Sequence, residues 1–155
     1  MKIRVLAVGR VRGPMADQLR VYEERSGRYW KLEVVEVDAG VRGAKSGPLQ
    51  VRAAEEERLL PHLPPGSDLI ALTRTGQEMG SRAFASYLHD RALHARDLCF
   101  VIGGAFGLGS GLLARARQLS LSAMTFPHEV ARFLLAEQLY RAGTILRGEP
   151  YHKGP

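Results

Sequence analysis

Cysteine is almost missing from this chain, whose 155 residues include only Cys99. A single thiol excludes an intrachain disulfide and a cysteine-rich zinc site. Because Cys99 lies inside the apolar run LCFVIGG, we expect a buried, inert thiol rather than a nucleophile. The sequence suggests no bound metal ion, and we expect none.

Long hydrophobic runs are also missing, and none approaches the length that crosses a bilayer. The opening MKIRVLAVGRV is short and is interrupted by Lys2, Arg4 and Arg10, so it does not have the pattern of a signal peptide. We therefore expect a cytoplasmic protein that has no membrane partner.

The remaining composition is that of an ordinary globular domain, with 45% hydrophobic and 25% charged residues. This length suits one full core, so we expect a single domain over residues 1–155. The net charge of +6 favours a polyanionic partner, because lysine and arginine displace counterions from phosphates. Many small basic proteins bind no nucleic acid, so charge alone leaves both interpretations open.

Apolar residues alternate along the chain between the period of a strand and that of a helix. We predict strands at residues 3–8, 32–37, 68–72, 98–102 and 119–122. The predicted helices cover residues 15–25, 49–60, 81–95, 112–117 and 127–146. Pro14 and Pro127 suit helix starts, and Ser81 suits an N-cap. The alternation predicts an α/β fold with a mostly parallel sheet and helices on both faces.

Three loops follow predicted strands at their carboxyl ends, where ligands bind in sheets of this kind. They are TRTG after Leu72, GGAFGLGSG after Ile102 and SAMTFP after Leu121. We expect these loops to share one pocket.

The glycine-rich segment VIGGAFGLGSG, residues 101–111, lets the backbone approach a ligand closely. It is not a P-loop, because the pattern Gly-x4-Gly-Lys-Ser/Thr is absent from the sequence. Gly109, Gly111 and Ala114 imitate a dinucleotide fingerprint, but they follow the fourth strand, and no acidic residue ends the fifth. The loop alone does not separate a backbone-lined adenosine pocket from a tight turn without a ligand.

The C-terminal stretch LSLSAMTFPHEVARFLLAEQLYRAGTILRGEPYHKGP, residues 119–155, carries a resemblance. Together with residues 102–104 and the segment AGVRG at 39–43, it resembles the ribosomal RNA large subunit methyltransferase H family, also called YbeA-like. Members of this family are small S-adenosylmethionine-dependent enzymes of the SPOUT class. The resemblance covers essentially the full length and is strongest over LSLSAMTFPH, AEQLYRA and PYHK.

The resemblance implies a SPOUT-type α/β fold with a C-terminal trefoil knot, a homodimer, and S-adenosyl-L-methionine bound in the knot. It also implies methylation of N3 of a pseudouridine in 23S rRNA on the assembled ribosome. Two positions depart from the family: Lys153 stands where many members have arginine, and Gly143 replaces a bulky aromatic residue. Carried over by position, the cofactor contacts are Leu72, Gly103, Gly104, Ser122, Ala123, Met124, Thr125, Phe126 and Pro127.

Such a reaction needs the sulfonium, the methyl group and N3 in line, and it needs the N3 proton removed. Imidazole titrates near neutral pH, so we hypothesise that His152 or His128 assists this step. Tyr151 and Lys153 would position the nucleotide, and Glu137, spaced for a helical salt bridge, would orient neighbouring groups. The candidate rRNA contacts are Arg4, Arg10, Arg12, Arg42, Lys45, Arg132 and Lys153.

The final predicted helix is apolar around most of its circumference, whereas a surface helix has one apolar stripe. A two-fold copy of the chain would cover it, and burial in the chain's own core is the alternative. Other functions also stay open: a non-catalytic ribosome- or RNA-binding protein, and a SPOUT methyltransferase acting on another RNA base. A nicotinamide-dependent reductase would need the acidic ribose contact that the sequence lacks.

Overall fold

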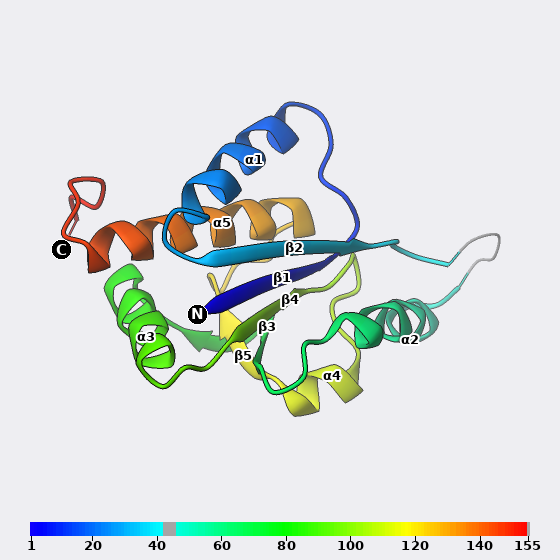
Figure 1. The fold of residues 1–155 in the computed structure, drawn as a ribbon. Helices are drawn as coiled ribbons and strands as arrows, with labels where there is room; N and C mark the ends of the chain where they lie inside the picture. The colour runs from blue at the N-terminus through cyan, green and yellow to red at the C-terminus, as the bar shows by residue number, and fades with distance from the viewer. Residues whose placement is uncertain (42–45, 155) are drawn as a thin grey trace.

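The computed structural model describes residues 1–41 and 46–154 (Figure 1). Within these residues, five strands pair in parallel in one sheet of order β2-β1-β4-β3-β5, which confirms the predicted parallel sheet. The strands are β1 (Lys2–Val8), β2 (Lys31–Val37), β3 (Asp68–Glu78), β4 (Leu98–Ile102) and β5 (Arg117–Ser120).

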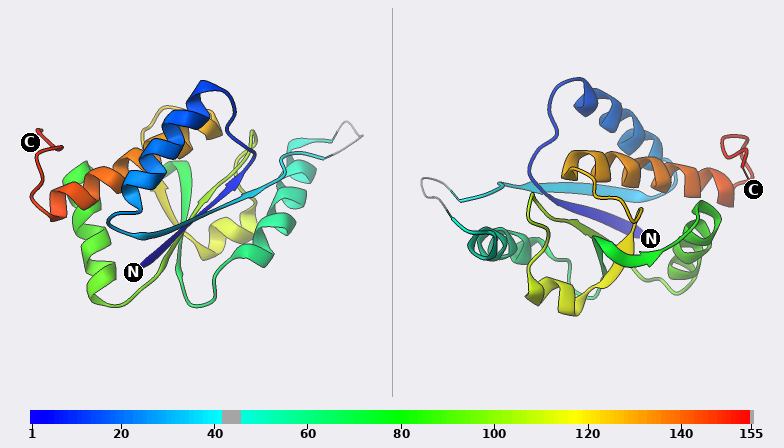
Figure 2. Two further views of the ribbon diagram at one scale, coloured as in Figure 1. Left: turned by 45° about the horizontal axis from the view of Figure 1, so that its top comes forward. Right: turned by 180° about the vertical axis from the view of Figure 1, so that it is seen from behind.

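Helices cover both faces of the sheet, as the alternation of elements predicts (Figures 1 and 2). One apolar core lies between the sheet and α3 and α5, with α1 packed against α5, and a second lies between the sheet and α2 and α4. The helices are α1 (Pro14–Ser26), α2 (Pro48–Leu59), α3 (Ser81–Leu93), α4 (Ser110–Arg115) and α5 (His128–Leu146), and the 3-10 turn η1 (Leu60–His62) extends α2.

The central strands explain how one chain fills two cores. Along β1, Ile3 and Val5 face the first core, whereas Leu6 and Val8 face the second, because successive side chains of a strand point to opposite faces. All the residues of β4 are buried, as its unbroken apolar run predicts. Burying both faces of the middle strands fixes the register of the sheet and the positions of the loops that leave it.

The pairing of β3 with β5 is interrupted at the place where a loop was expected. Leu119 is the partner of both Leu72 and Gln77, so the four intervening residues leave the ladder. A Cβ at Gly76 would lie 2.6 Å from the carbonyl carbon of Gln118, so the chain passes directly against the β5 backbone there. The trefoil knot itself stays a prediction.

Several predicted boundaries are wrong. β3 continues to Glu78, because Gln77 and Glu78 pair with β5; their exposed polar side chains gave no sign of a strand. Gly80, not Ser81, is the N-cap of α3, and the Ser81 hydroxyl instead donates to Oε1 of Gln138 on α5, at 2.8 Å. The last short helix and strand, α4 and β5, each begin two residues earlier than predicted.

Candidate functional site

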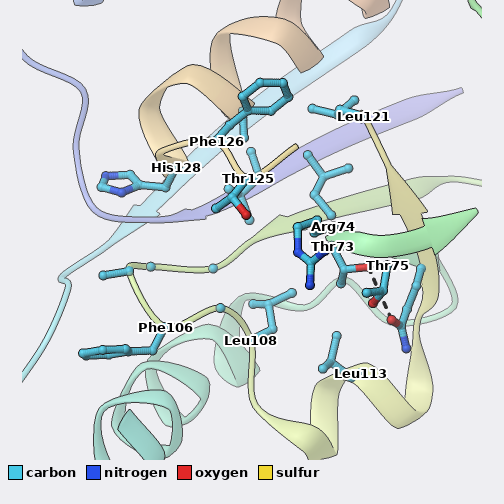
Figure 3. A pocket seen from close by; sticks show the side chains of 18 of the residues that line it. Thr73, Arg74, Thr75, Phe106, Leu108, Leu113, Leu121, Thr125, Phe126 and His128 are labelled. Atoms are coloured by element: carbon cyan, nitrogen blue, oxygen red, sulfur yellow. Dashed lines mark hydrogen bonds between the residues drawn. The ribbon is translucent and has the colours of Figure 1, made fainter. Parts of the chain in front are cut away.

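A cavity of about 540 Å³ opens where β4 and β5 end and where β3 leaves its ladder (Figure 3). Its walls come from residues 72–75, 102–108 and 121–126, which confirms that the three loops share one pocket. Ala123 and Pro127 belong to the same segment but are not among the lining residues. The predicted cofactor contacts that line the cavity are Leu72, Gly103, Gly104, Ser122, Met124, Thr125 and Phe126.

The glycine turn after β4 is packed against itself. A Cβ at Gly103 would lie 2.6 Å from the carbonyl carbon of Gly107 and 2.8 Å from its oxygen. Gly107 has φ +78°, and its N–H donates to the carbonyl oxygen of Gly104 at 3.0 Å. Backbone atoms cannot rotate away as a side chain can, so Gly103 keeps this turn narrow and leaves its other side open to the cavity.

Glu55 of α2 lies behind this turn, and sequence reasoning missed it. Its side chain is buried, and Oε1 accepts a hydrogen bond from the Gly40 N–H at 2.8 Å. Within the described part of the chain, Oε2 has no partner. A Cβ at Gly104 would lie 2.8 Å from both carboxylate oxygens, so Glu55 links the backbone after β2 to the glycine turn. In the sequence, Glu55 begins a run of three glutamates that resembles a solvated helix face.

The third wall is held between β5 and α5. The Ser120 hydroxyl lies 3.1 Å from the carbonyl oxygen of Arg74 and 2.8 Å from that of Ser122. The Met124 N–H donates to Oγ of Ser122 at 3.1 Å, which tightens the turn. These contacts tie the segment after β5 to the bulge of β3, so two walls of the cavity are fixed to each other.

The charge at the cavity is positive. Arg52 of α2 and Arg74 of the β3 bulge line it, and no aspartate or glutamate does so among the described residues. Figure 3 shows the Arg74 side chain beside those of Thr73 and Thr75. Sequence reasoning placed Arg74 only within a pocket loop and did not select Arg52. The cavity therefore combines apolar and backbone surface with two guanidinium groups that suit an anionic group.

His128 is the histidine that lines this cavity, at the first position of α5. Its ring packs on Gly9, whose φ of +84° turns the chain after β1. A Cβ at Gly9 would lie 2.8 Å from Nε2 of His128, so the missing side chain makes room for the imidazole. The side chain of His128 is 28% exposed, which leaves the ring accessible from the cavity mouth.

The other predicted catalytic residues gather beside the C-terminal half of α5. The Tyr151 hydroxyl donates to Oε1 of Glu137 at 3.0 Å, and Nε of Arg141 donates to the same oxygen at 3.0 Å. Arg141 also lies over the Tyr151 ring at 4.8 Å, and its Nη1 is 3.2 Å from Nδ1 of His152. Burial, with hydrogen bonds to Tyr22 and Glu137, raises the pKa of Tyr151 above its usual value. The expected Glu137–Arg141 ion pair is confirmed.

This tail cluster is remote from the cavity of the same chain. Glu137 and Arg141, which contact Tyr151 and His152, lie nine and thirteen residues beyond His128, or about 14 and 20 Å along α5 at 1.5 Å per residue. The structure therefore does not bring Tyr151 and His152 together with His128 within one chain. Nε2 of His152 is buried and has no partner within residues 1–41 and 46–154.

The predicted rRNA contacts differ in exposure and in their partners. Arg132 is 6% exposed and pairs with Glu23 and Glu36, so its guanidinium is not free to meet RNA in this structure. Arg4 is also occupied, since it bonds Glu33 and the carbonyl oxygen of His62. Both arginines were selected on charge, which does not reveal burial. Arg42 and Lys45 lie outside the described residues, whereas Arg10, Arg12 and Lys153 are exposed.

Cys99 is fully buried, as expected, and burial raises its pKa to about 11. Within residues 1–41 and 46–154, no group of three or more histidine, cysteine, aspartate or glutamate side chains is arranged to hold a metal ion. Of the helices described there, none is both long and apolar enough to span a membrane.

Comparison with known proteins assigns this architecture to a family. The family described as "Predicted SPOUT methyltransferase" matches residues 1–152. The chain therefore belongs to the SPOUT methyltransferase family. A solved structure of a methylase family protein from Neisseria gonorrhoeae shares the fold, with a TM-score of 0.52, 15% identity, and coverage of 90% of this chain and 81% of that one.

Curated relatives narrow the placement within the family. A protein of Gemmatimonas aurantiaca named ribosomal RNA large subunit methyltransferase H is 48% identical over 99% of this chain and 100% of its own length. A protein of the same name from Anaeromyxobacter sp. (strain Fw109-5) is also 48% identical, with the same coverage of both chains. The resemblance carried by the C-terminal motifs is thus confirmed over the full length.

Proposed function

We propose that this protein transfers a methyl group from S-adenosylmethionine to N3 of a pseudouridine in 23S rRNA on the ribosome, in the cytoplasm. The observation that carries the proposal is the single cavity built by the three strand-end segments. Residues of the C-terminal motifs line it, and two full-length relatives are named ribosomal RNA large subunit methyltransferase H.

The cavity suits S-adenosylmethionine in size and chemistry. Its volume of about 540 Å³ lies within the usual range for small-molecule sites. Leu72, Ile102 and Phe126 supply apolar walls, while the glycine turn exposes main-chain N–H and C=O groups to an adenine edge. Arg52 or Arg74 would bind the carboxylate of the methionine portion. When bound, the cofactor supplies an already activated methyl group.

The chain's own residues then have to hold the target base and accept a proton. His128 stands at the cavity mouth, where its imidazole can take the N3 proton. Its position is set by Gly9 beneath the ring and by the start of α5. Holding the two reactants in line supplies a large part of the rate enhancement in such a transfer.

The tail cluster would act in the site of a second subunit. Tyr151 contacts Glu137 and His152 contacts Arg141, about 14 and 20 Å along α5 from His128, and neither tail residue lines the cavity of its own chain, so they would reach a cavity in a partner. Tyr22 and Tyr140 pack edge-on at 6.1 Å between α1 and α5, and Phe133 stands 5.3 Å from Tyr22. We infer that this aromatic, partly exposed face forms the interface of a two-fold dimer.

Three measurements test the proposal. Calorimetry should show micromolar binding of S-adenosylmethionine, and ribosomes from a deletion strain should gain one methyl group on the 23S pseudouridine by mass spectrometry. His128→Ala should abolish transfer while binding persists, and His89→Ala, an exposed histidine on α3, is the matched control. Absence of cofactor binding would favour a non-catalytic RNA-binding protein, and a methyl group elsewhere would favour another RNA base.

Complementation tests whether the tail acts across a dimer. Mixed after co-refolding, inactive His128→Ala and His152→Ala chains should recover about a quarter of the wild-type activity. Half of the dimers would then contain one chain of each variant, and each of these dimers would have one site with both histidines. If the tail served its own chain, no site would contain both histidines, and no activity would return.

A further inference from the structure

A second cavity lies at the opposite end of the sheet. It has a volume of about 490 Å³ and opens where β3 and β5 begin, between α3 and the end of α4. Asp68, Tyr87, Arg91, Arg115 and Arg117 line it, and we call it the arginine cleft. The first cavity stands at the carboxyl ends of these strands, and the two cavities share no lining residue, although Gln118 of the first directly follows Arg117 of the second.

The arginine cleft is built around an aromatic ring. The Arg117 guanidinium lies over the Tyr87 ring at 5.0 Å from its centroid, and that of Arg91 lies at 5.6 Å. Such cation–π contacts hold the planar donors in place without neutralising their charge. With two guanidinium groups over its ring, Tyr87 is better suited to fix these donors than to stack a base.

Positive charge exceeds negative charge in this cleft. Arg91 and the neighbouring Arg96 share Asp68, whose pKa is lowered by its hydrogen bond to Arg96, so this carboxylate is ionised at neutral pH. Asp90 pairs with Arg91 from the same helix.

Arg115 and Arg117 are exposed, and neither pairs with a carboxylate among the described residues. The side chain of Gln77, which is neutral, accepts a hydrogen bond from Arg117. Two guanidinium groups are therefore left to meet an anion from solution.

We propose that the arginine cleft binds phosphodiester groups of the substrate RNA, at a distance from the nucleotide that is methylated. This inference rests on the proposed function, because it takes the polyanion to be the RNA on which the enzyme acts. Guanidinium forks bind phosphate oxygens in a bidentate manner, and an open, polar cleft suits a backbone that passes through it. Contacts of this kind position a nucleic acid without reading its sequence.

The test compares salt dependence of binding to a fluorescein-labelled, protein-free fragment of 23S rRNA, measured by anisotropy over a series of KCl concentrations. The double variant Arg115→Ala/Arg117→Ala should bind about tenfold more weakly, and the slope of log K against log [KCl] should fall by about 0.7 to 0.9 per lost contact. Arg115→Lys/Arg117→Lys should retain most of the slope. The charge-matched control Arg20→Ala/Arg28→Ala, on exposed positions of and after α1, should lose much less.

The outcomes separate this inference from the proposed function. Calorimetry with S-adenosylmethionine should give the same affinity for the Arg115/Arg117 variants as for wild type, because neither arginine lines the first cavity. Unchanged affinity and slope in the alanine variant would overturn the inference while leaving the methyltransferase proposal intact. A loss seen with whole ribosomal subunits but not with protein-free RNA would also overturn it, since it would indicate an acidic protein surface.

Discussion

Replacing Gly103 by alanine tests whether the glycine turn shapes the cofactor cavity. The added Cβ would lie 2.6 Å from the carbonyl carbon of Gly107 and 2.9 Å from the nitrogen of Leu108. Carbon atoms in ordinary contact are about 3.5 to 4.0 Å apart, so the backbone of the turn must move by about 1 Å. Overpacking of this kind typically costs about 1 to 3 kcal/mol.

We expect Gly103→Ala to lower the free energy of unfolding in urea by about 2 kcal/mol and the melting temperature by about 4 to 8 °C. Because Gly103 and Gly107 also line the cavity, the same movement should weaken binding of S-adenosylmethionine at least about tenfold, equivalent to about 1.4 kcal/mol. Urea denaturation and calorimetry measure the two effects on one preparation.

Gly80→Ala is the matched control. Its backbone angle φ is −68°, and a Cβ there would meet no atom within 4 Å. Gly80 is an N-cap, so alanine should cost less than about 1 kcal/mol and should leave cofactor binding unchanged. If Gly103→Ala matched this control in stability and affinity, the turn would not be as tightly packed as the structure indicates.

Three further substitutions test other parts of the structure. Arg132→Met should lower the free energy of unfolding by about 3 kcal/mol, because it leaves the carboxylates of Glu23 and Glu36 without their partner. It should leave the salt dependence of RNA binding unchanged, and a changed salt dependence would indicate that Arg132 contacts RNA. Gly143→Ala should destabilise the chain, because its Cβ would lie 2.2 Å from the Tyr29 ring, and the cost should largely vanish in a Tyr29→Ala background. A double-mutant cycle without coupling would contradict that packing. Cys99, whose pKa burial raises to about 11, should resist a thiol reagent at pH 8 until the protein unfolds, and its Cys99→Ala variant reports the background.

The same thiol gives a pH dependence of stability. The ordinary pKa of 9.0 is raised to about 11 in the folded chain, so the unfolded thiol ionises first as pH rises. Between these two values the unfolded state binds fewer protons, and stability falls with increasing pH. The decline in unfolding free energy between pH 9 and 11 should be smaller in Cys99→Ala; equal declines would refute this assignment.

The periodicity of apolar residues was sufficient to predict the sheet and its two helical layers, because it depends on which face of each element is buried. It failed at Gln77 and Glu78, which are polar and exposed, and which form a strand only because β5 passes beside them. Gln77 pairs with Leu119, which lies 42 residues further along the chain, and no local sequence pattern encodes such a pairing.

Glycine positions show the same limit for the site. The sequence marked the turn at residues 103–107 as unusual, but only the structure shows that Gly103 packs on the turn's own backbone. Gly143, noted as a departure from the family, is explained by the Tyr29 ring, which occupies the space where a side chain would stand. Tyr29 lies in the connection between α1 and β2, and its hydroxyl also donates to Glu149.

Net charge was informative in total and misleading residue by residue. Arg4, Arg132 and Arg141 each form an ion pair with a carboxylate of the same chain, which balances part of their charge. Of the described guanidinium groups without such partners, those of Arg52 and Arg74 line the first cavity, and those of Arg115 and Arg117 line the arginine cleft. Counting cations therefore indicated a polyanionic partner, whereas their pairing indicates where it can bind.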